Sequence, residues 1–304
     1  MDGILRNNID FKRVGYFILI AYALAWIPEF WYFSAGRTLH SGWFTMLAIG
    51  CMFAPAVAAI ILQKTLVKEP LSEIGLHFTF NKWYIIAPLI AIVLVLFSVP
   101  ASALLSETEL TNGLPFIAEQ LDKSSAIAPS DRDTALKSLE QLGSWLPVVI
   151  IGGGILGALI AGPTLNAIPA LGEELGWRGF LYKELKPLGF WTSSIIIGAV
   201  WGFWHLPLII HGFNYPETPV AGIFMMVLFT VLISPIFTYV LERSNTILVP
   251  AAFHGTLNAV AGIPILFFLG ASNLIVGIQG LAGLIVLLIL NCIIFLIRNN
   301  ESNH

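Results

Sequence analysis

Charged side chains are scarce in this sequence. Only 11% of its 304 residues are Asp, Glu, Lys or Arg, and 57% are apolar, whereas a soluble domain carries about 25% charged residues. This deficit excludes an ordinary soluble globular protein and predicts a membrane protein. The net charge is −3 and no run of Lys or Arg occurs, so we expect no nucleic-acid partner.

Cysteine is nearly absent as well. Cys51 and Cys292 both lie in apolar runs, which is typical of small buried hydrophobes rather than of a disulfide or a metal site. The sequence has no His-Glu-x-x-His, which excludes the ordinary zinc-protease helix. We find no low-complexity tract or strong internal repeat, so we expect a single transmembrane domain over residues 1–304.

Long apolar runs are what the chain has in abundance. About eight of them reach the roughly 20 residues that a helix needs to cross a hydrocarbon core about 30 Å thick. We predict an all-α, polytopic membrane protein with spans near 14–35, 43–63, 83–105, 145–168, 190–210, 219–241, 246–268 and 274–297. The first run is too long for a typical signal-peptide core, so we interpret it as a transmembrane helix.

The placement of lysine and arginine predicts the orientation of these spans. With the N-terminus inside, 11 basic residues fall on the inner side and 4 on the outer side. We therefore expect a multi-pass protein of the cell membrane with both termini in the cytoplasm. The inner set is Arg6, Lys12, Arg13, Lys64, Lys68, Lys82, Arg178, Lys183, Lys186, Arg243 and Arg298, and the outer set is Arg37, Lys123, Arg132 and Lys137.

The only long polar segment covers 106–144 and is expected on the outer side. Its residues 130–133, Ser-Asp-Arg-Asp, are typical of a helix start, and apolar residues then recur at helical spacing from Ala135 to Leu142. This pattern predicts a short amphipathic helix on the outer surface. A plain connector is the alternative.

The charge that does occur between apolar runs is concentrated in residues 172–179, Gly-Glu-Glu-Leu-Gly-Trp-Arg-Gly. An ionisable group at bilayer depth costs several kcal/mol, so it is a functional hypothesis by default. Glu174 and Arg178 have the spacing of an intrahelical ion pair, whereas Glu173 points about 100° away from Glu174. Glu173 is therefore free to act as a general base. An ordinary surface Glu–Arg pair at a helix end is the alternative. The segment either continues the fourth helix or re-enters beside it.

His205 is a polar residue inside the apolar fifth run. It follows Trp201, Phe203 and Trp204 and precedes Pro207. A histidine in such a place can also be a simple interhelical hydrogen-bond partner. The same helix carries glycines at 198 and 202, which predict close approach of another helix on that face.

His254 and Asn258 are four residues apart and so share one helical face. With Glu173 and His205 they form a plausible water-activating site, in which the glutamate takes the proton and the other groups hold the water or the oxyanion. If a divalent metal such as zinc binds, the same four residues become its ligands. The residues leave open whether a metal is bound at all. Interhelical contacts, at about 0.6–2 kcal/mol each, are the alternative role.

The depth of the two histidines is a difficulty for this site. At 1.5 Å per residue, His254 lies about 12 Å into its predicted helix from the inner side and His205 about 22 Å into its own. A common site therefore requires tilted helices, or a fifth helix that begins outside the hydrocarbon core.

These clusters resemble the CAAX protease and bacteriocin-processing family, intramembrane proteases that include the CAAX prenyl endopeptidases. The family pattern is Glu-Glu-x-x-x-Arg, then Phe-x-x-x-His, then His-x-x-x-Asn. The resemblance covers about residues 166–262, and Trp201 stands where phenylalanine is expected. The matching residues are Glu173, Glu174, Arg178, His205, His254 and Asn258.

The resemblance implies an intramembrane endopeptidase, of metallo- or glutamate type, that cuts a membrane-anchored peptide or protein, as in CAAX-box processing. Glu173 would be the activating base, and His205, His254 and Asn258 would hold the water. Glu174 would belong to the catalytic group, with Arg178 and Trp201 supporting it.

The cavity of this site is expected to open toward the cytoplasmic leaflet. Two functions of other classes are alternatives to the protease. A non-catalytic bacteriocin-immunity or partner-binding membrane protein is an alternative from another class. So is a proton-coupled transporter in which Glu173, His205 and His254 relay protons, although no inverted repeat with broken helices is visible.

Overall fold

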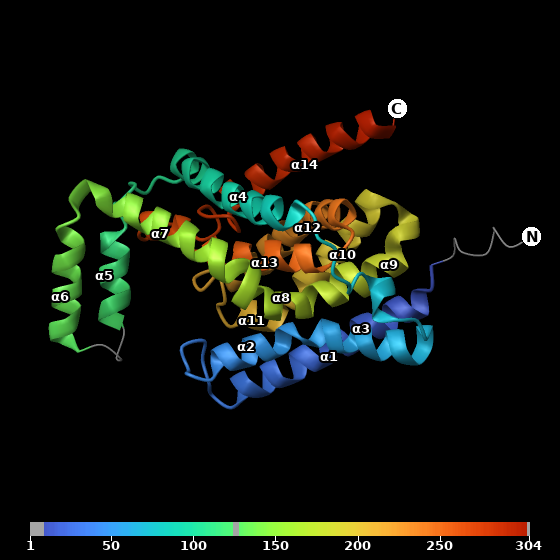
Figure 1. The fold of residues 1–304 in the computed structure, drawn as a ribbon. Coiled ribbons are helices and arrows are strands. Elements are labelled where there is room, and N and C mark those ends of the chain that lie inside the picture. Colours follow the sequence, from blue (N-terminus) through green and yellow to red (C-terminus); the bar gives the residue numbers. More distant parts are fainter. Residues whose placement is uncertain (1–8, 124–127, 303–304) are drawn as a thin grey trace, which may run out of the picture.

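The computed structural model describes residues 9–123 and 128–302, and it contains helices but no strand in those residues. Figure 1 shows a bundle of long helices with several short ones between them. The predicted all-α class is confirmed. The first half of the chain forms α1 (Phe11–Ser34), α2 (Phe44–Met52), α3 (Ala54–Leu62), η1 (Gln63–Val67), η2 (Leu71–Ile74), α4 (Trp83–Leu105), α5 (Leu114–Lys123) and α6 (Pro129–Glu140).

The second half continues with one long helical run. This run consists of η3 (Gly143–Trp145), α7 (Leu146–Ala161), η4 (Gly162–Asn166), α8 (Ala167–Glu174), η5 (Leu175–Leu181), α9 (Tyr182–Leu185) and η6 (Lys186–Leu188). After it come α10 (Phe190–Trp204), α11 (Leu206–Ile210), α12 (Pro219–Ser244), α13 (Leu248–Val260), η7 (Pro264–Phe267) and α14 (Leu281–Ser302).

Seven helices among the described residues are long and apolar enough to cross a membrane. The predicted fifth span, 190–210, is instead broken, because α10 ends at Trp204 and α11 begins at Leu206. Pro207 explains the break, since proline lacks an amide hydrogen and its ring clashes with the preceding turn. The predicted last span begins at Leu281 rather than near 274.

The segment with the two glutamates continues the fourth helix, which was one of the two predicted arrangements. Helical structure runs from Gly143 to Leu188 over 46 residues. Two π-helical stretches, η4 and η5, lie on either side of α8. Such widened turns inside α-helices are frequent at functional sites.

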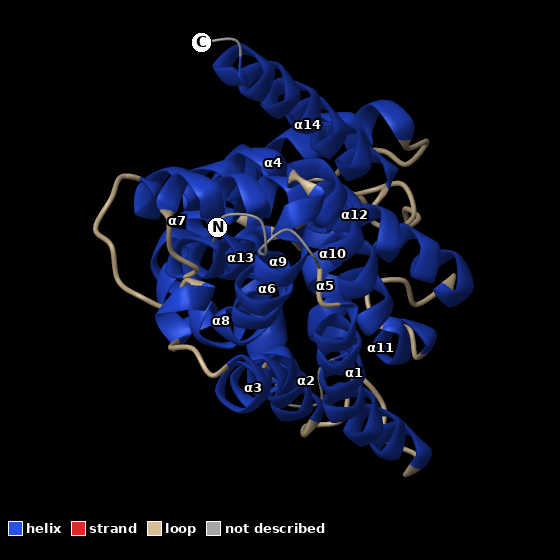
Figure 2. Cartoon of the chain, turned by 90° about the vertical axis from the view of Figure 1, so that its right-hand side faces the viewer, coloured by secondary structure: helices blue, strands red, loops and turns tan. Residues whose placement is uncertain are grey.

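Helix α13 lies in the middle of the bundle. It packs against α4, α7, α8 and η4, and also contacts α12. Helix α10 packs along α12, where a Cβ atom added at Gly198 or Gly202 would collide with Thr230, so the close approach predicted for this face is present. Figure 2 shows α13 and α10 in the middle of the view, with α14 on one side and α1–α3 on the other.

The segment 106–144 contains two helices rather than one. The predicted helix is present as α6, and the sequence analysis missed α5, which lies beside it. Nη1 of Arg132 in α6 lies 3.3 Å from Oδ1 of Asp122 in α5. Figure 1 shows the pair standing apart from the bundle at the far end from the two termini.

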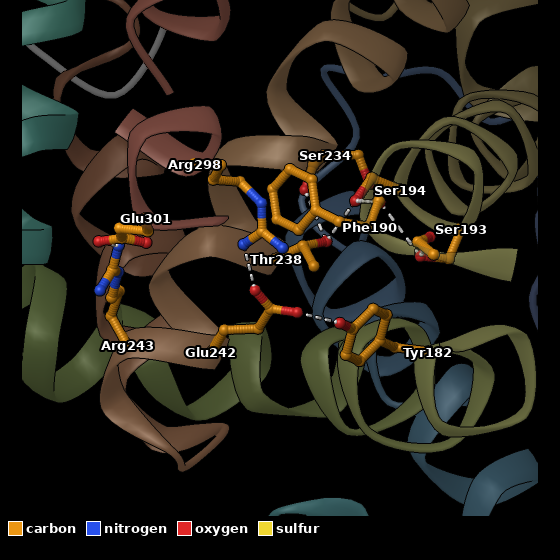
Figure 3. A network of polar contacts seen from close by, with 11 residues as sticks. Tyr182, Phe190, Ser193, Ser194, Ser234, Thr238, Glu242, Arg243, Arg298 and Glu301 are labelled. Carbon is orange, nitrogen blue, oxygen red and sulfur yellow. Dashed lines mark hydrogen bonds and ion pairs between the residues drawn. The ribbon is translucent and has the colours of Figure 1, made fainter. Parts of the chain in front are cut away.

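Ion pairs gather at the end of the bundle where α1 begins and α14 ends. Arg13 of α1 pairs with Glu184 of α9 at 3.6 Å, and Arg298 of α14 pairs with Glu242 of α12. Figure 3 shows the second pair, in which Glu242 also accepts a hydrogen bond of 2.6 Å from Tyr182. Basic residues gathered at one end of a helical bundle are typical of a membrane–water boundary.

Candidate active site

Glu174 and Arg178 form the ion pair that their spacing predicts. Arg178 Nη1 lies 3.2 Å from Glu174 Oε1, and both side chains are 0% exposed. His254 of α13 brings Nδ1 to 2.8 Å from the same oxygen. Glu174 is therefore occupied by two partners, and it links the fourth helix to α13.

The guanidinium of Arg178 is held by aromatic rings as well as by Glu174. Its Cζ lies 4.4 Å from the centroid of Trp201 and 4.1 Å from that of Phe237, a favourable cation–π arrangement. Nη2 donates to Ser234 Oγ at 3.3 Å. Sequence reasoning missed Ser234 and Phe237, because they come from α12 and no local spacing relates them to Arg178.

Glu173 points elsewhere, as the helical rotation predicts. Its side chain is buried, with 3% exposed, and Oε2 accepts a hydrogen bond of 2.6 Å from Trp201 Nε1. The described residues give Glu173 no ion pair. The tryptophan that replaces the expected phenylalanine therefore contributes a donor that phenylalanine lacks.

His205 lies in the break between α10 and α11. Its Nδ1 is 2.9 Å from the carbonyl oxygen of Trp201. A carbonyl only accepts, and a carboxylate only accepts, so the Nδ1 atoms of His205 and His254 both carry the proton. When the ring is neutral, Nε2 of each histidine is an acceptor for a further hydrogen bond.

The difficulty over helix depth disappears in the structure. The ring centroid of Trp201 lies 5.9 Å from that of His205 and 5.4 Å from that of His254. The two histidines thus approach one tryptophan from α10 and α13. The packing of the helices therefore brings both histidines to one site, although α10 runs without a break from Phe190 to Trp204.

One cavity of about 420 Å³ brings the predicted groups together. Its walls include Glu173, His205, His254 and Asn258. Glu174 and Arg178 are not part of its lining, and they contact the lining residues His254 and Trp201 from outside the cavity. Sequence reasoning missed Glu29 of α1, which also lines this cavity. A lone carboxylate in an apolar span was the signal that could have identified it.

The cavity extends toward the end of the bundle that does not carry the termini. Its lining includes Asn214, just before α12, and Gln279, just before α14. The other end of α12 lies beside the end of α14, where Glu242 pairs with Arg298. The expected opening toward the cytoplasmic leaflet therefore conflicts with cytoplasmic termini. If the termini are cytoplasmic, the cavity extends toward the opposite side.

A metal ion in this cavity would need several ligand side chains close together. No group of three His, Cys, Asp or Glu side chains within residues 9–123 and 128–302 is placed to hold an ion. One oxygen of Glu174 is already shared by Arg178 and His254. Zinc binding by Glu173, His205, His254 and Asn258 stays a prediction.

The fold and the site define the protein first as a helical integral membrane protein with a cavity lined by both polar and apolar side chains. Residues 155–260 match the family described as "Type II CAAX prenyl endopeptidase Rce1-like". CAAX prenyl protease 2 of Methanococcus maripaludis is 38% identical over 52 residues, which are 17% of this chain and 19% of that relative. The matched region contains all three motifs, so the resemblance to CAAX proteases is confirmed for this third of the chain.

Proposed function

We propose that the protein is an intramembrane endopeptidase that hydrolyses a peptide bond in a membrane-anchored peptide or protein. One observation carries the proposal. Glu173, without an ion pair among the described residues, shares a cavity with His205, His254 and Asn258, while the neighbouring Glu174 is occupied by other partners. Two adjacent carboxylates thus have separate roles.

The chemistry follows from these placements. Glu173 takes a proton from a water molecule, whose oxygen attacks the carbonyl carbon of the scissile bond. Nε2 of His205 accepts a hydrogen bond that orients this water. The amide of Asn258 donates to the developing oxyanion. When the carbon–nitrogen bond breaks, the proton on Glu173 passes to the leaving nitrogen, and the carboxylate is restored.

Glu174 and Arg178 position the groups of the cavity wall. Glu174 orients the ring of His254 through Nδ1, as carboxylates commonly do for functional histidines. Arg178 neutralises Glu174 and supports the face of Trp201, which in turn donates to Glu173. The two residues therefore connect the histidine and the base through one packed unit.

The substrate class that we propose is broader than the one that the relative's name indicates. That name refers to a CAAX prenyl protease, and the alignment covers 19% of its length. A bilayer-anchored peptide is the class that a cavity between membrane-spanning helices supports. Both termini are proposed to be cytoplasmic, on the strength of the 11-to-4 distribution of basic residues.

The test is cleavage of a panel of membrane-anchored peptides by the purified protein in liposomes. Glu173→Gln should lower kcat/KM at least about hundredfold, because a general base contributes about 10²–10⁴-fold. Glu217→Gln is the matched control, since this exposed glutamate lies outside the cavity. Wild-type activity of Glu173→Gln, or no cleavage of any peptide by the wild type, would contradict the proposal.

Metal content and chelator sensitivity are measured in the same preparation. Cleavage that persists with chelator, in protein without bound metal, supports water activation by Glu173 alone. Loss of cleavage together with a removable metal supports a metalloprotease. Proton uptake into liposomes without any cleavage would favour the transporter alternative.

A further inference from the structure

Glu29 is a buried acid that the proposed chemistry does not use. It lies in α1, has 1% of its surface exposed, and lines the same cavity as Glu173. Its Oε2 has no hydrogen-bond partner among the described residues. A buried polar atom without a hydrogen bond lowers stability. A ligand that donates a hydrogen bond to this oxygen would remove that cost.

The position of Glu29 is fixed by contacts one turn earlier in α1. Trp26 Nε1 donates to the carbonyl oxygen of Trp204 at 2.9 Å, which holds α1 against the end of α10. Cys51 Sγ of α2 lies 3.7 Å from the carbonyl oxygen of Ala25. Helix α1 is thereby fixed between α10 and α2, with Glu29 on the cavity side.

The charges around the cavity are unbalanced. Its lining includes two glutamates and neither lysine nor arginine. Arg178 stands outside the lining and is held by Glu174. A cation entering the cavity would therefore find acidic oxygens that no resident cation occupies.

The remaining wall suits the stem of a long basic side chain. Met226, Phe229 and Leu257 are among its apolar members. Lysine and arginine pack their methylene groups along such surfaces while the charged end reaches a polar partner. An acidic side chain would face two carboxyl groups of the same kind.

We propose that Glu29 determines specificity by receiving a lysine or arginine side chain of the peptide whose scissile bond lies at Glu173. This inference rests on the proposed endopeptidase function and adds the substrate class. Glu29 is a binding residue in this account, because it touches a side chain of the substrate and not the reacting atoms.

The test uses pairs of membrane-anchored peptides that differ at one position, lysine in one and leucine in the other. The position is moved through the four residues on each side of the cleaved bond. At the best position the wild type should prefer lysine by at least about tenfold in kcat/KM, as expected for a charge-assisted hydrogen bond. Glu29→Gln, an isosteric change, should bring this ratio close to one. Glu217→Gln should keep the wild-type ratio.

The outcomes separate this inference from the proposed function. Cleavage without a lysine preference at any position, or a preference that survives in Glu29→Gln, overturns the role of Glu29 and leaves the protease intact. Binding is measured in parallel with fluorescent lysine and leucine peptides on Glu173→Gln. Selective binding of the lysine peptide that Glu29→Gln abolishes, without cleavage by the wild type, would overturn the protease and retain the basic-peptide site.

Discussion

Two arginine–glutamate pairs in this molecule have the same chemistry in opposite surroundings. Arg178 and Glu174 are both 0% exposed, and the guanidinium lies against two aromatic rings. Arg298 and Glu242 are 30% and 29% exposed, and Figure 3 shows them in contact beside Tyr182. Water can replace a lost partner in the second pair but not in the first, so the two pairs should differ in their effects on stability.

The difference also concerns what each pair holds in place. The exposed pair joins the end of α14 to α12, and Tyr182 adds a third member. The buried pair supports His254 and Trp201, both of which line the cavity. The exposed pair therefore connects two helices locally, whereas the buried pair positions residues of the cavity.

Removing Arg178 should have the largest effect on stability. Arg178→Gln leaves Glu174 as a buried carboxylate with only His254 beside it, which should cost about 3–5 kcal/mol of the free energy of unfolding. Denaturant unfolding in detergent micelles measures the change. The double change Glu174→Gln with Arg178→Gln should cost less than Arg178→Gln alone. A single variant as stable as the wild type would show that the buried pair is not a structural unit.

Replacing Trp201, which lies against the buried pair, should have a smaller effect, and on catalysis rather than on stability. Trp201→Phe keeps an aromatic ring beside Arg178 but removes the Nε1 donor to Glu173. Because a hydrogen bond to a charged group contributes about 1.5–3 kcal/mol, kcat should fall about tenfold or more, while KM changes little. Steady-state cleavage of one membrane-anchored peptide measures both constants. An unchanged kcat would mean that Glu173 does not depend on this donor.

The exposed pair should give the smallest effect. Arg298→Gln removes one partner of Glu242, and exposed ion pairs contribute about 0–1 kcal/mol. The free energy of unfolding should change by no more than about 1 kcal/mol, and peptide cleavage should match the wild type. A loss as large as that of Arg178→Gln would contradict the distinction between the two pairs.

Local spacing predicted the parts of the site that lie within one helix. The pair Glu174–Arg178 and the separate direction of Glu173 follow from helical rotation, and both are present. The common cavity of His205 and His254 followed less directly, because straight helices placed them at different depths. The missing information lies in the packing between helices, which places Trp201 of α10 beside His254 of α13.

Contacts between helices far apart in sequence could not be predicted from the chain alone. Ser234 and Phe237 hold Arg178 from α12, and nothing in their spacing points to it. The contribution of α1 was overlooked for a different reason. Glu29 was visible as a carboxylate in an apolar span, but only the packing of α1 on α10 places it in the cavity.

The most direct measurement of the central claim is the cleavage rate of Glu173→Gln beside that of Glu217→Gln, at equal amounts of folded protein in liposomes. The account predicts that Glu173→Gln loses at least about hundredfold in kcat/KM, with an unfolding midpoint near that of the wild type, and that Glu217→Gln keeps full activity. Equal cleavage by the two variants would contradict the assignment of Glu173 as the base.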